Sequence, residues 1–184
     1  MAELKGTGWE LLVERLSLHT NGEQRRTYGR YALFIDGKPA GVEGFMCESH
    51  GPGDNQTPEN GKRVEPGRYA VFTHFGRYRT IGYADDAAPP GADPMPGIRL
   101  EETGVRTDIL IHPAYPAPGK LYLASIGCLN PAAALAPEED NDFWDSRRRT
   151  IVLIDSLRAF SPESFVADES LPIPNAAVII EGEP

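Results

Sequence analysis

Apolar and polar residues alternate along the first third of the chain, which is the pattern of strands buried on one face. The alternation covers residues 9–19, resumes at residues 31–35 and is weaker over residues 42–47. The dipeptides Asn21-Gly22 and Asp36-Gly37 follow the first two segments, and both are typical of tight turns between antiparallel strands. We therefore expect the chain to begin with a β-meander.

The rest of the chain contains shorter apolar segments separated by turn-forming residues. Aromatic and β-branched residues are frequent in them, which favours strands. The strands expected here cover residues 68–74, 79–84, 97–101, 107–112 and 175–181. We expect long loops at residues 48–63, which are polar and rich in turn formers, and at residues 85–97, which are rich in proline.

The pattern changes after Cys128, where alternation gives way to helical spacing. Pro131 and the alanines that follow favour a helix start, because proline is tolerated in a first helical turn. A longer helix is expected from a cap at Ser146 to about Phe160, although the apolar run at residues 150–154 also fits a strand. The predicted class is mainly β (α+β), a mixed sheet or small β-sandwich with one or two helices after the cysteine.

Length, composition and charge narrow the class of protein. A chain of 184 residues, 40% of them hydrophobic, can form a single domain over residues 1–184 with a substantial core. Gly (19) and Pro (17) make about a fifth of the chain, which agrees with a loop-rich β-structure. The net charge of −9 disfavours binding to nucleic acid, and we expect no membrane span because no apolar run is long enough.

The N-terminus shows no basic segment followed by an apolar run. It therefore lacks the pattern of a signal peptide or of a lipidation signal. We expect the protein to be made in the cytoplasm, and either to remain there or to be exported by a route that needs no cleaved signal.

The segment from Thr107 to Pro131 contains the strongest candidates for chemistry. An apolar strand ends at His112, and Cys128 follows sixteen positions later, directly after Gly127. A thiol with a pKa of ~8.5 is only slightly ionised at neutral pH, so an imidazole that accepts its proton would make it a nucleophile. A glycine beside it would let a substrate carbonyl approach backbone N–H groups that stabilise an oxyanion.

The same segment resembles the catalytic signature of the L,D-transpeptidase catalytic domain family, a histidine followed at a distance by Ser/Thr-His-Gly-Cys-x-Asn or Arg. The residues that match are His112, Ser125, Gly127, Cys128 and Asn130. The resemblance extends less specifically over roughly residues 30–182, including residues 64–71 and 175–181. Small variants of this fold include type VI secretion effectors that attack peptidoglycan and often lack a signal peptide.

The resemblance implies acyl transfer on peptidoglycan stem peptides, with no cofactor and no metal. Cys128 would attack the diaminopimelate–D-alanine carbonyl and form a thioester, and His112 would protonate the departing D-alanine. An amine, a free D-amino acid or water would resolve the thioester, which gives transpeptidase, exchange or L,D-carboxypeptidase activity. The supporting roles fall to Ser125, Ile126 and Gly127 in the oxyanion turn and to Asn130, which would position the loop or bind substrate. The resemblance also implies action in the periplasm or cell wall after non-classical export, and it allows an immunity or secretion protein as partner.

Two positions depart from the family pattern. Ile126 stands where the family often has a second histidine, and Pro113 replaces a small residue. Either His112 alone is the base, or the site is degraded and the protein is a β-domain that binds cell-wall peptide or another protein. A cysteine peptidase acting on proteins is a further alternative without a motif of its own.

The other cysteine and the histidines and arginines that could carry chemistry also fit ordinary structural roles. A zinc site could use Cys47, His50, His74, His112 and Cys128. No pair of cysteines or of histidines has the close spacing of usual zinc sites, although Cys47 and His50 are three apart. A disulfide between Cys47 and Cys128 is conceivable after export, but it would block the nucleophile. His74 fits a packed strand end, and residues 147–149 fit a solvated, self-paired surface.

Overall fold

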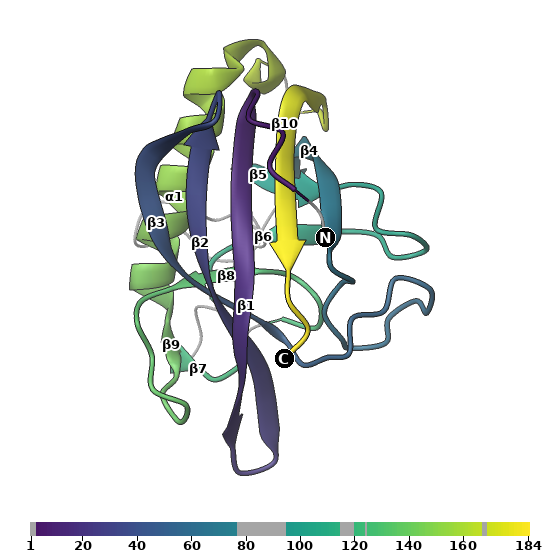
Figure 1. Cartoon of the computed structure of the whole chain (residues 1–184), viewed down its shortest axis with the longest axis vertical. Coiled ribbons are helices and arrows are strands. Elements are labelled where there is room, and N and C mark those ends of the chain that lie inside the picture. The colour runs from purple at the N-terminus through teal and green to yellow at the C-terminus, as the bar shows by residue number, and fades with distance from the viewer. Residues whose placement is uncertain (1–2, 77–94, 115–119, 124, 167–168) are drawn as a thin grey trace.

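The computed structural model describes residues 3–76, 95–114, 120–123, 125–166 and 169–184 (Figure 1). The strands are β1 (Trp9–Asn21), β2 (Gln24–Ile35), β3 (Lys38–Ser49), β4 (Gly67–Gly76), β5 (Met95–Leu100), β6 (Ile109–Ile111), β7 (Lys120–Leu121), β8 (Asn130–Ala132), β9 (Asn141–Asp142) and β10 (Pro172–Glu181). The helices are α1 (Phe143–Phe160) and the 3-10 helix η1 (Pro162–Phe165). The expected mainly β class is confirmed, and both helices follow Cys128.

The expected β-meander is confirmed, with longer strands than the alternation alone indicated. β1, β2 and β3 pair antiparallel in sequence order. The turn between β2 and β3 has positive φ at both central residues, 49° at Asp36 and 73° at Gly37. Such a turn matches the twist of the flanking strands, and Asp and Gly are among the residues that tolerate it.

Eight strands form one mixed sheet in the order β6-β5-β4-β10-β1-β2-β3-β8. Among the named strands in the described part of the chain, β1 and β10 pair in parallel and the other pairs are antiparallel. The expected C-terminal strand lies in the middle of the sheet order. The two end strands approach each other through an isolated parallel bridge between Ile111 and Leu129. This bridge nearly closes the sheet, and Cys128 lies immediately beside it.

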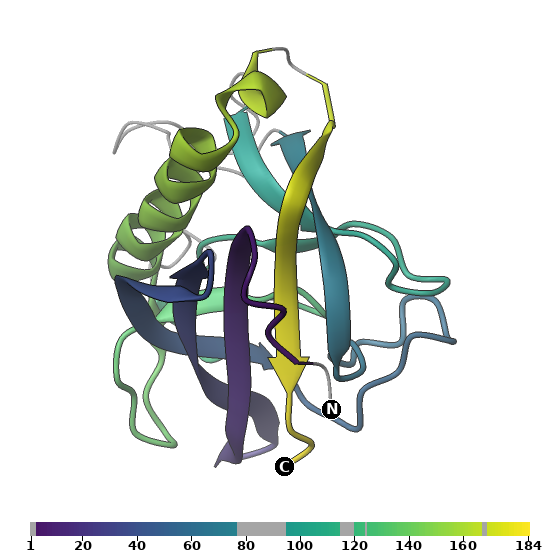
Figure 2. The same ribbon diagram turned by 45° about the horizontal axis from the view of Figure 1, so that its top comes forward.

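The hydrophobic core lies between the inner face of this sheet and α1. Alternate residues of β1 and three successive apolar positions of α1 belong to one buried cluster, namely Trp9, Leu11, Val13, Leu153, Ile154 and Leu157. The indole N–H of Trp9 also donates to Ser156 Oγ at 2.9 Å, which fixes α1 against β1. Figure 2 shows α1 along one side of the sheet, with η1 leading the chain back into β10.

The long helix is confirmed, but its expected cap is wrong. α1 begins at Phe143, and the Asp142 carboxylate accepts from the Asp145 N–H at the N-terminus. Ser146 lies inside the helix, where its hydroxyl accepts from the Ala114 N–H at 2.9 Å. The strand alternative for residues 150–154 is also wrong, because Leu153 and Ile154 pack into the core at helical spacing.

The helix expected from Pro131 is wrong as well. Asn130–Ala132 forms β8, in which Pro131 lies opposite Met46 of β3. An end strand tolerates a proline because one side of its backbone needs no ladder hydrogen bond. Pairing with a strand more than eighty residues earlier in the chain therefore overrides the local preference.

The two expected loops have different outcomes. No strand or helix lies between β3 and β4, so the first loop is confirmed, although Glu48 and Ser49 belong to β3. Residues 95–97, which were expected in the second loop, instead begin β5 and pair with β4. The rest of that expected loop, and the strand expected at residues 79–84, lie outside the described residues.

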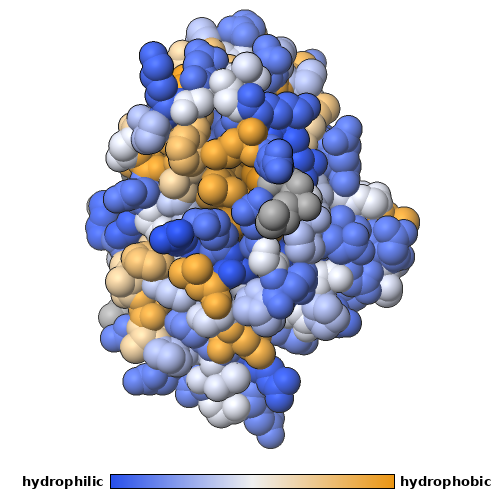
Figure 3. All heavy atoms as spheres, viewed as in Figure 1, coloured by the Kyte–Doolittle hydropathy of each residue, from blue (hydrophilic) through white to orange (hydrophobic). Residues whose placement is uncertain are grey.

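The face of the sheet seen in Figure 1 carries separate apolar patches among hydrophilic residues (Figure 3). Leu16 and Leu18 of β1 are among the exposed apolar side chains. None of the helices in the described part of the chain is long and apolar enough to cross a membrane.

Candidate active site

The candidate residues meet at the place where the sheet nearly closes. The Leu129 N–H donates to Leu110 O at 2.9 Å, and the His112 N–H donates to Leu129 O at 3.0 Å. This register sets Cys128 beside Leu110 and Asn130 beside His112. Residues sixteen positions apart in the sequence are thus brought to one short seam between β6 and β8.

The Cys128 sulfur lies against the backbone at the start of β6 and is partly exposed. The Leu110 N–H donates to Sγ at 3.4 Å, and the thiol can donate to Asp108 O at 3.5 Å. The two contacts act in opposite directions on ionisation. A donor to sulfur favours the thiolate, whereas a carbonyl that accepts the thiol proton favours the neutral form.

Asp108 has the backbone conformation that presents its carbonyl to this sulfur. Its φ is 55°, in the left-handed region, which Asp tolerates better than most residues. Strained backbone of this kind is frequent at functional sites. The residue was not selected from the sequence, where nothing distinguishes it from other aspartates before strands.

Two serine hydroxyls hold the turn before Cys128. Ser125 Oγ donates to Cys128 O at 2.7 Å, and the buried Ser49 hydroxyl on β3 donates to Ser125 O at 3.0 Å. Gly127 has φ 150°, which disfavours any residue with a side chain. Ile126 points outward and is 69% exposed, so an apolar side chain lies at the surface next to the thiol.

His112 is buried, and a backbone carbonyl lies next to one of its ring nitrogens. Its Nδ1 lies 2.7 Å from Pro113 O. A carbonyl only accepts, so Nδ1 carries the proton in the neutral ring and Nε2 is the basic nitrogen. A backbone carbonyl is therefore the group that orients this imidazole.

Asn130 is buried and its amide lies over His112. Its Nδ2 donates to His112 O at 2.9 Å and lies 3.3 Å and 3.5 Å from the two ring nitrogens. Of the two roles considered for Asn130, positioning is the one that these contacts support.

Arg106 also belongs to this site, although no motif in the sequence marks it as a site residue. Its guanidinium donates to Ile126 O at 3.2 Å and to Asp54 O at 3.5 Å. Burial lowers the pKa of Arg106, while attraction to Cys128, Asp54 and Tyr69 works in the opposite direction. A guanidinium nevertheless stays charged at physiological pH, so a fixed cation lies under the turn that carries the thiol.

The other cysteine has a contrasting environment. Cys47 is buried, and burial raises the pKa of its thiol to about 11, against attraction by Arg26 that lowers it. Both cysteines are free thiols. The environment of Cys47 makes it unreactive at neutral pH, whereas Cys128 is accessible.

The remaining candidates lie apart from this seam. His74 pairs with Gly97 between β4 and β5, and residues 148 and 149 form ion pairs with Asp145. In the part of the chain that the structure describes, no group of three or more His, Cys, Asp or Glu residues could hold a metal ion.

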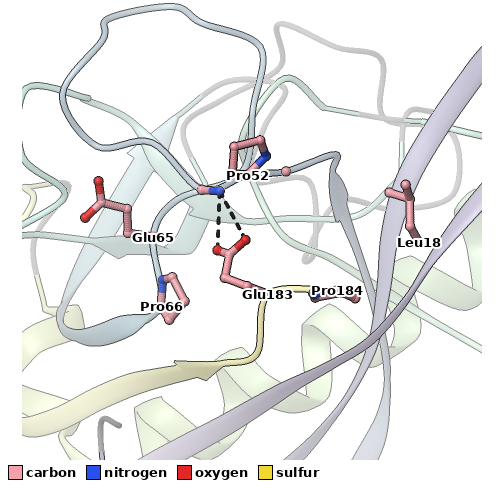
Figure 4. A pocket seen from close by; sticks show the side chains of 8 residues that line it. Leu18, Pro52, Glu65, Pro66, Glu183 and Pro184 are labelled. Atoms are coloured by element: carbon pink, nitrogen blue, oxygen red, sulfur yellow. Dashed lines mark hydrogen bonds between the residues drawn. The ribbon is translucent and has the colours of Figure 1, made fainter.

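A separate hollow of about 810 Å³ lies beside the loop between β3 and β4 (Figure 4). It is lined by Leu18, Gly51, Pro52, Gly53, Glu65, Pro66, Glu183 and Pro184. The Glu183 carboxylate accepts from the Gly53 N–H, and the two distances are 3.3 Å and 3.4 Å. This lining offers neither a thiol nor an imidazole, so the candidate residues for nucleophilic chemistry lie at the seam and not in this hollow.

Comparison with protein-family models, with curated proteins and with solved structures found no match.

Proposed function

We propose that this protein is a cysteine-dependent acyltransferase that acts on peptidoglycan stem peptides, as an L,D-transpeptidase or L,D-carboxypeptidase. The observation that carries the proposal is that one backbone bridge between Ile111 and Leu129 brings a partly exposed Cys128 and a buried His112 to the same short seam. A donor N–H at the sulfur and a glycine turn beside it add features that acyl transfer needs. The substrate class is supported by the resemblance of the sequence to L,D-transpeptidases.

The first half-reaction consumes the stem peptide and releases D-alanine. His112 Nε2 accepts the Cys128 proton, and the thiolate attacks the carbonyl of the diaminopimelate–D-alanine bond. The tetrahedral intermediate collapses with cleavage of the C–N bond. The imidazolium gives its proton to the departing amine, which leaves a thioester on Cys128.

The second half-reaction restores the thiol. An amine or water attacks the thioester carbonyl, and His112 accepts the proton of the incoming nucleophile. Cleavage of the C–S bond returns the thiolate, which takes that proton back. An amine acceptor gives a cross-linked or exchanged stem, whereas water gives a tripeptide.

A non-catalytic domain that binds cell-wall peptide or protein is the second candidate. The observation that favours it is Ile126, which places an exposed apolar side chain where the family often has a histidine. A binding domain would retain affinity for peptidoglycan in Cys128→Ala but would leave every stem unchanged.

The test is incubation with purified peptidoglycan under reducing conditions, followed by analysis of the muropeptides. The protein should convert tetrapeptide stems to tripeptides, cross-linked dimers or exchanged stems. Cys128→Ala should abolish this conversion, and Cys47→Ala should leave it intact. Unchanged stems with the unmodified protein would reject the enzymatic proposal in favour of the binding domain.

For the place of action we propose the cell-wall compartment. The support is the substrate class of the proposed reaction, because peptidoglycan stem peptides lie in that compartment. Expression directed to the periplasm should alter the wall, whereas expression confined to the cytoplasm should not.

A further inference from the structure

Hydrogen bonds hold the backbone of Arg106 in place, and its side chain extends from there to the candidate site. Its N–H donates to Thr103 O at 3.3 Å, and its carbonyl accepts from Thr103 Oγ1 at 2.7 Å. The preceding residue, Val105, donates to Asn55 O at 3.0 Å, which ties this turn to the loop between β3 and β4. The guanidinium therefore extends from a rigid base.

The guanidinium occupies the space next to Gly127. A Cβ added at Gly127 would lie 2.0 Å from Arg106 Nη2, a distance that no side chain could tolerate without displacing the arginine. The same nitrogen donates to Ile126 O at 3.2 Å. The glycine of the candidate signature is thus needed for a second reason besides its φ, because it leaves room for this cation.

The charge of Arg106 has no carboxylate at ion-pair distance among the described residues. It is only 7% exposed, and its two hydrogen bonds go to the carbonyls of Ile126 and Asp54. A buried cation bonded only to neutral acceptors is costly. A negative charge that forms nearby, on Cys128, would offset this cost.

We propose that Arg106 is a positioning residue that holds the turn before Cys128 and stabilises the thiolate of that cysteine. The attraction between Arg106 and Cys128 supports this role. At the sulfur, the cation and the Leu110 N–H both favour the thiolate, whereas the Asp108 carbonyl favours the neutral thiol. The inference deepens the proposed function, but the thiolate can be measured without any peptidoglycan.

Other ionisable groups lie near Arg106 and Cys128 and could also affect the pH dependence of Cys128. Asp54 and Tyr69 interact electrostatically with Arg106 from the loop and from β4. Asp108 precedes β6 and His112 follows it. None of these groups is altered in the variants below, so a change in the profile of Cys128 reports on Arg106.

The test is the pH dependence of Cys128 alkylation by iodoacetamide, followed by mass spectrometry of the peptide that contains Cys128. An opposite charge close to an acid lowers its pKa by ~1–3 units, so Arg106→Met should move the profile upward by about one unit. Alkylation below that range should then be about tenfold slower. Arg106→Lys, which keeps the charge but loses the planar fork, should show a smaller shift.

Two further variants make the result decisive. Gly127→Ala should shift the profile in the same direction, because its Cβ displaces the guanidinium. Arg149→Met is the matched control, since Arg149 is also partly buried but pairs with Asp145 on α1, and it should leave the profile unchanged. Circular dichroism identifies any variant that fails to fold; if Arg106→Met is one of them, the shift of the profile in Gly127→Ala decides.

Failure of this inference is distinguishable from failure of the proposed function. Profiles that coincide in the unmodified protein, Arg106→Lys and Arg106→Met would overturn the role of Arg106, even if the protein modifies peptidoglycan. A shifted profile in a protein that leaves all stems unchanged would support Arg106 and reject the peptidoglycan enzyme.

Discussion

Cys47 lies opposite Asn130 in the sheet, only two residues along from Cys128, yet the two thiols have different chemistry. Cys47 points into a small apolar cluster with Tyr28 and Ala132, where burial opposes ionisation. Cys128 lies at the end of the seam, partly exposed and in contact with a backbone N–H. The difference arises from exposure and local donors, because both residues lie in or next to the same strand pair.

This contrast predicts selective alkylation. At neutral pH, iodoacetamide should modify Cys128 and should leave Cys47 unmodified over the same period, because the thiolate is the reacting form. Mass spectrometry of the two cysteine peptides measures both rates in one sample, so Cys47 is the internal control. Equal rates would mean that Cys128 has no special activation.

The raised pKa of Cys47 also predicts a stability change in alkaline solution. The folded state holds this pKa at about 11, against 9.0 for an ordinary thiol, so the unfolded chain loses its proton first. The contribution is fully present below pH ~9 and is lost as the pH rises through ~11. Urea unfolding should therefore show a steeper fall in unfolding free energy over this range for the unmodified protein than for Cys47→Ala. Buried tyrosines also have raised pKa values, and the variant keeps them as a common background.

Among the elements, α1 shows how sequence spacing becomes packing. Leu153 and Leu157 face the sheet and are fully buried, while Val152 lies on the outer face and is 46% exposed. The carboxylate of Asp142 accepts a hydrogen bond from an N–H at the helix start. Asp and Ser are both favoured N-cap residues, so the sequence alone does not distinguish Asp142 from Ser146 as the cap. The helix is therefore four residues longer than a cap at Ser146 indicates.

The helix gives a prediction about stability. Leu153→Ala should lower the unfolding free energy by about 2–5 kcal/mol, because it removes buried methyl groups and leaves a cavity. Val152→Ala is the matched control on the neighbouring exposed position and should change it by less than about 0.5 kcal/mol. Both values come from urea unfolding followed by circular dichroism. Similar losses in the two variants would contradict the packing of α1 described here.

In the whole molecule, a buried ionic cluster links segments that are far apart in the chain. Arg15 on β1 donates to both carboxylate oxygens of Glu48 on β3, at 3.0 Å and 2.8 Å. Arg63, in the loop between β3 and β4, pairs with Glu183 after β10. The cluster ties this loop and the C-terminal segment to the meander, and the same loop carries the Asp54 carbonyl that holds Arg106.

Removal of one charge from this cluster should destabilise the protein. Glu48→Gln leaves the fully buried Arg15 side chain with only the partly exposed Glu183 carboxylate, at 3.4 Å, as a counter-charge, which should cost about 3–5 kcal/mol. Glu14→Gln breaks the exposed pair with Arg30 and should cost less than about 1 kcal/mol. Chemical denaturation of the two variants gives the comparison. A loss at Glu48 as small as that at Glu14 would show that the cluster does not bind these segments together.

The sequence predicts those elements whose formation depends on residues close together in the chain. The alternation and the Asp36-Gly37 turn define the meander, and the apolar run of β10 marks a central strand. The helix predicted from Pro131 is wrong because β8 forms through pairing with β3, a distant contact that no local preference encodes. Arg106 could not be found for a similar reason, since its role depends on a turn twenty residues further along that folds over it.

The central claim is that Cys128 forms a covalent acyl intermediate, and the most direct measurement is the mass of that intermediate. The protein is mixed with tetrapeptide stems, quenched in acid during turnover, digested and analysed by mass spectrometry. The account predicts that the peptide containing Cys128 gains the mass of the stem acyl group without D-alanine, and that Cys128→Ala shows neither this adduct nor D-alanine release. Release of D-alanine by Cys128→Ala, or an adduct on a different residue, would contradict it.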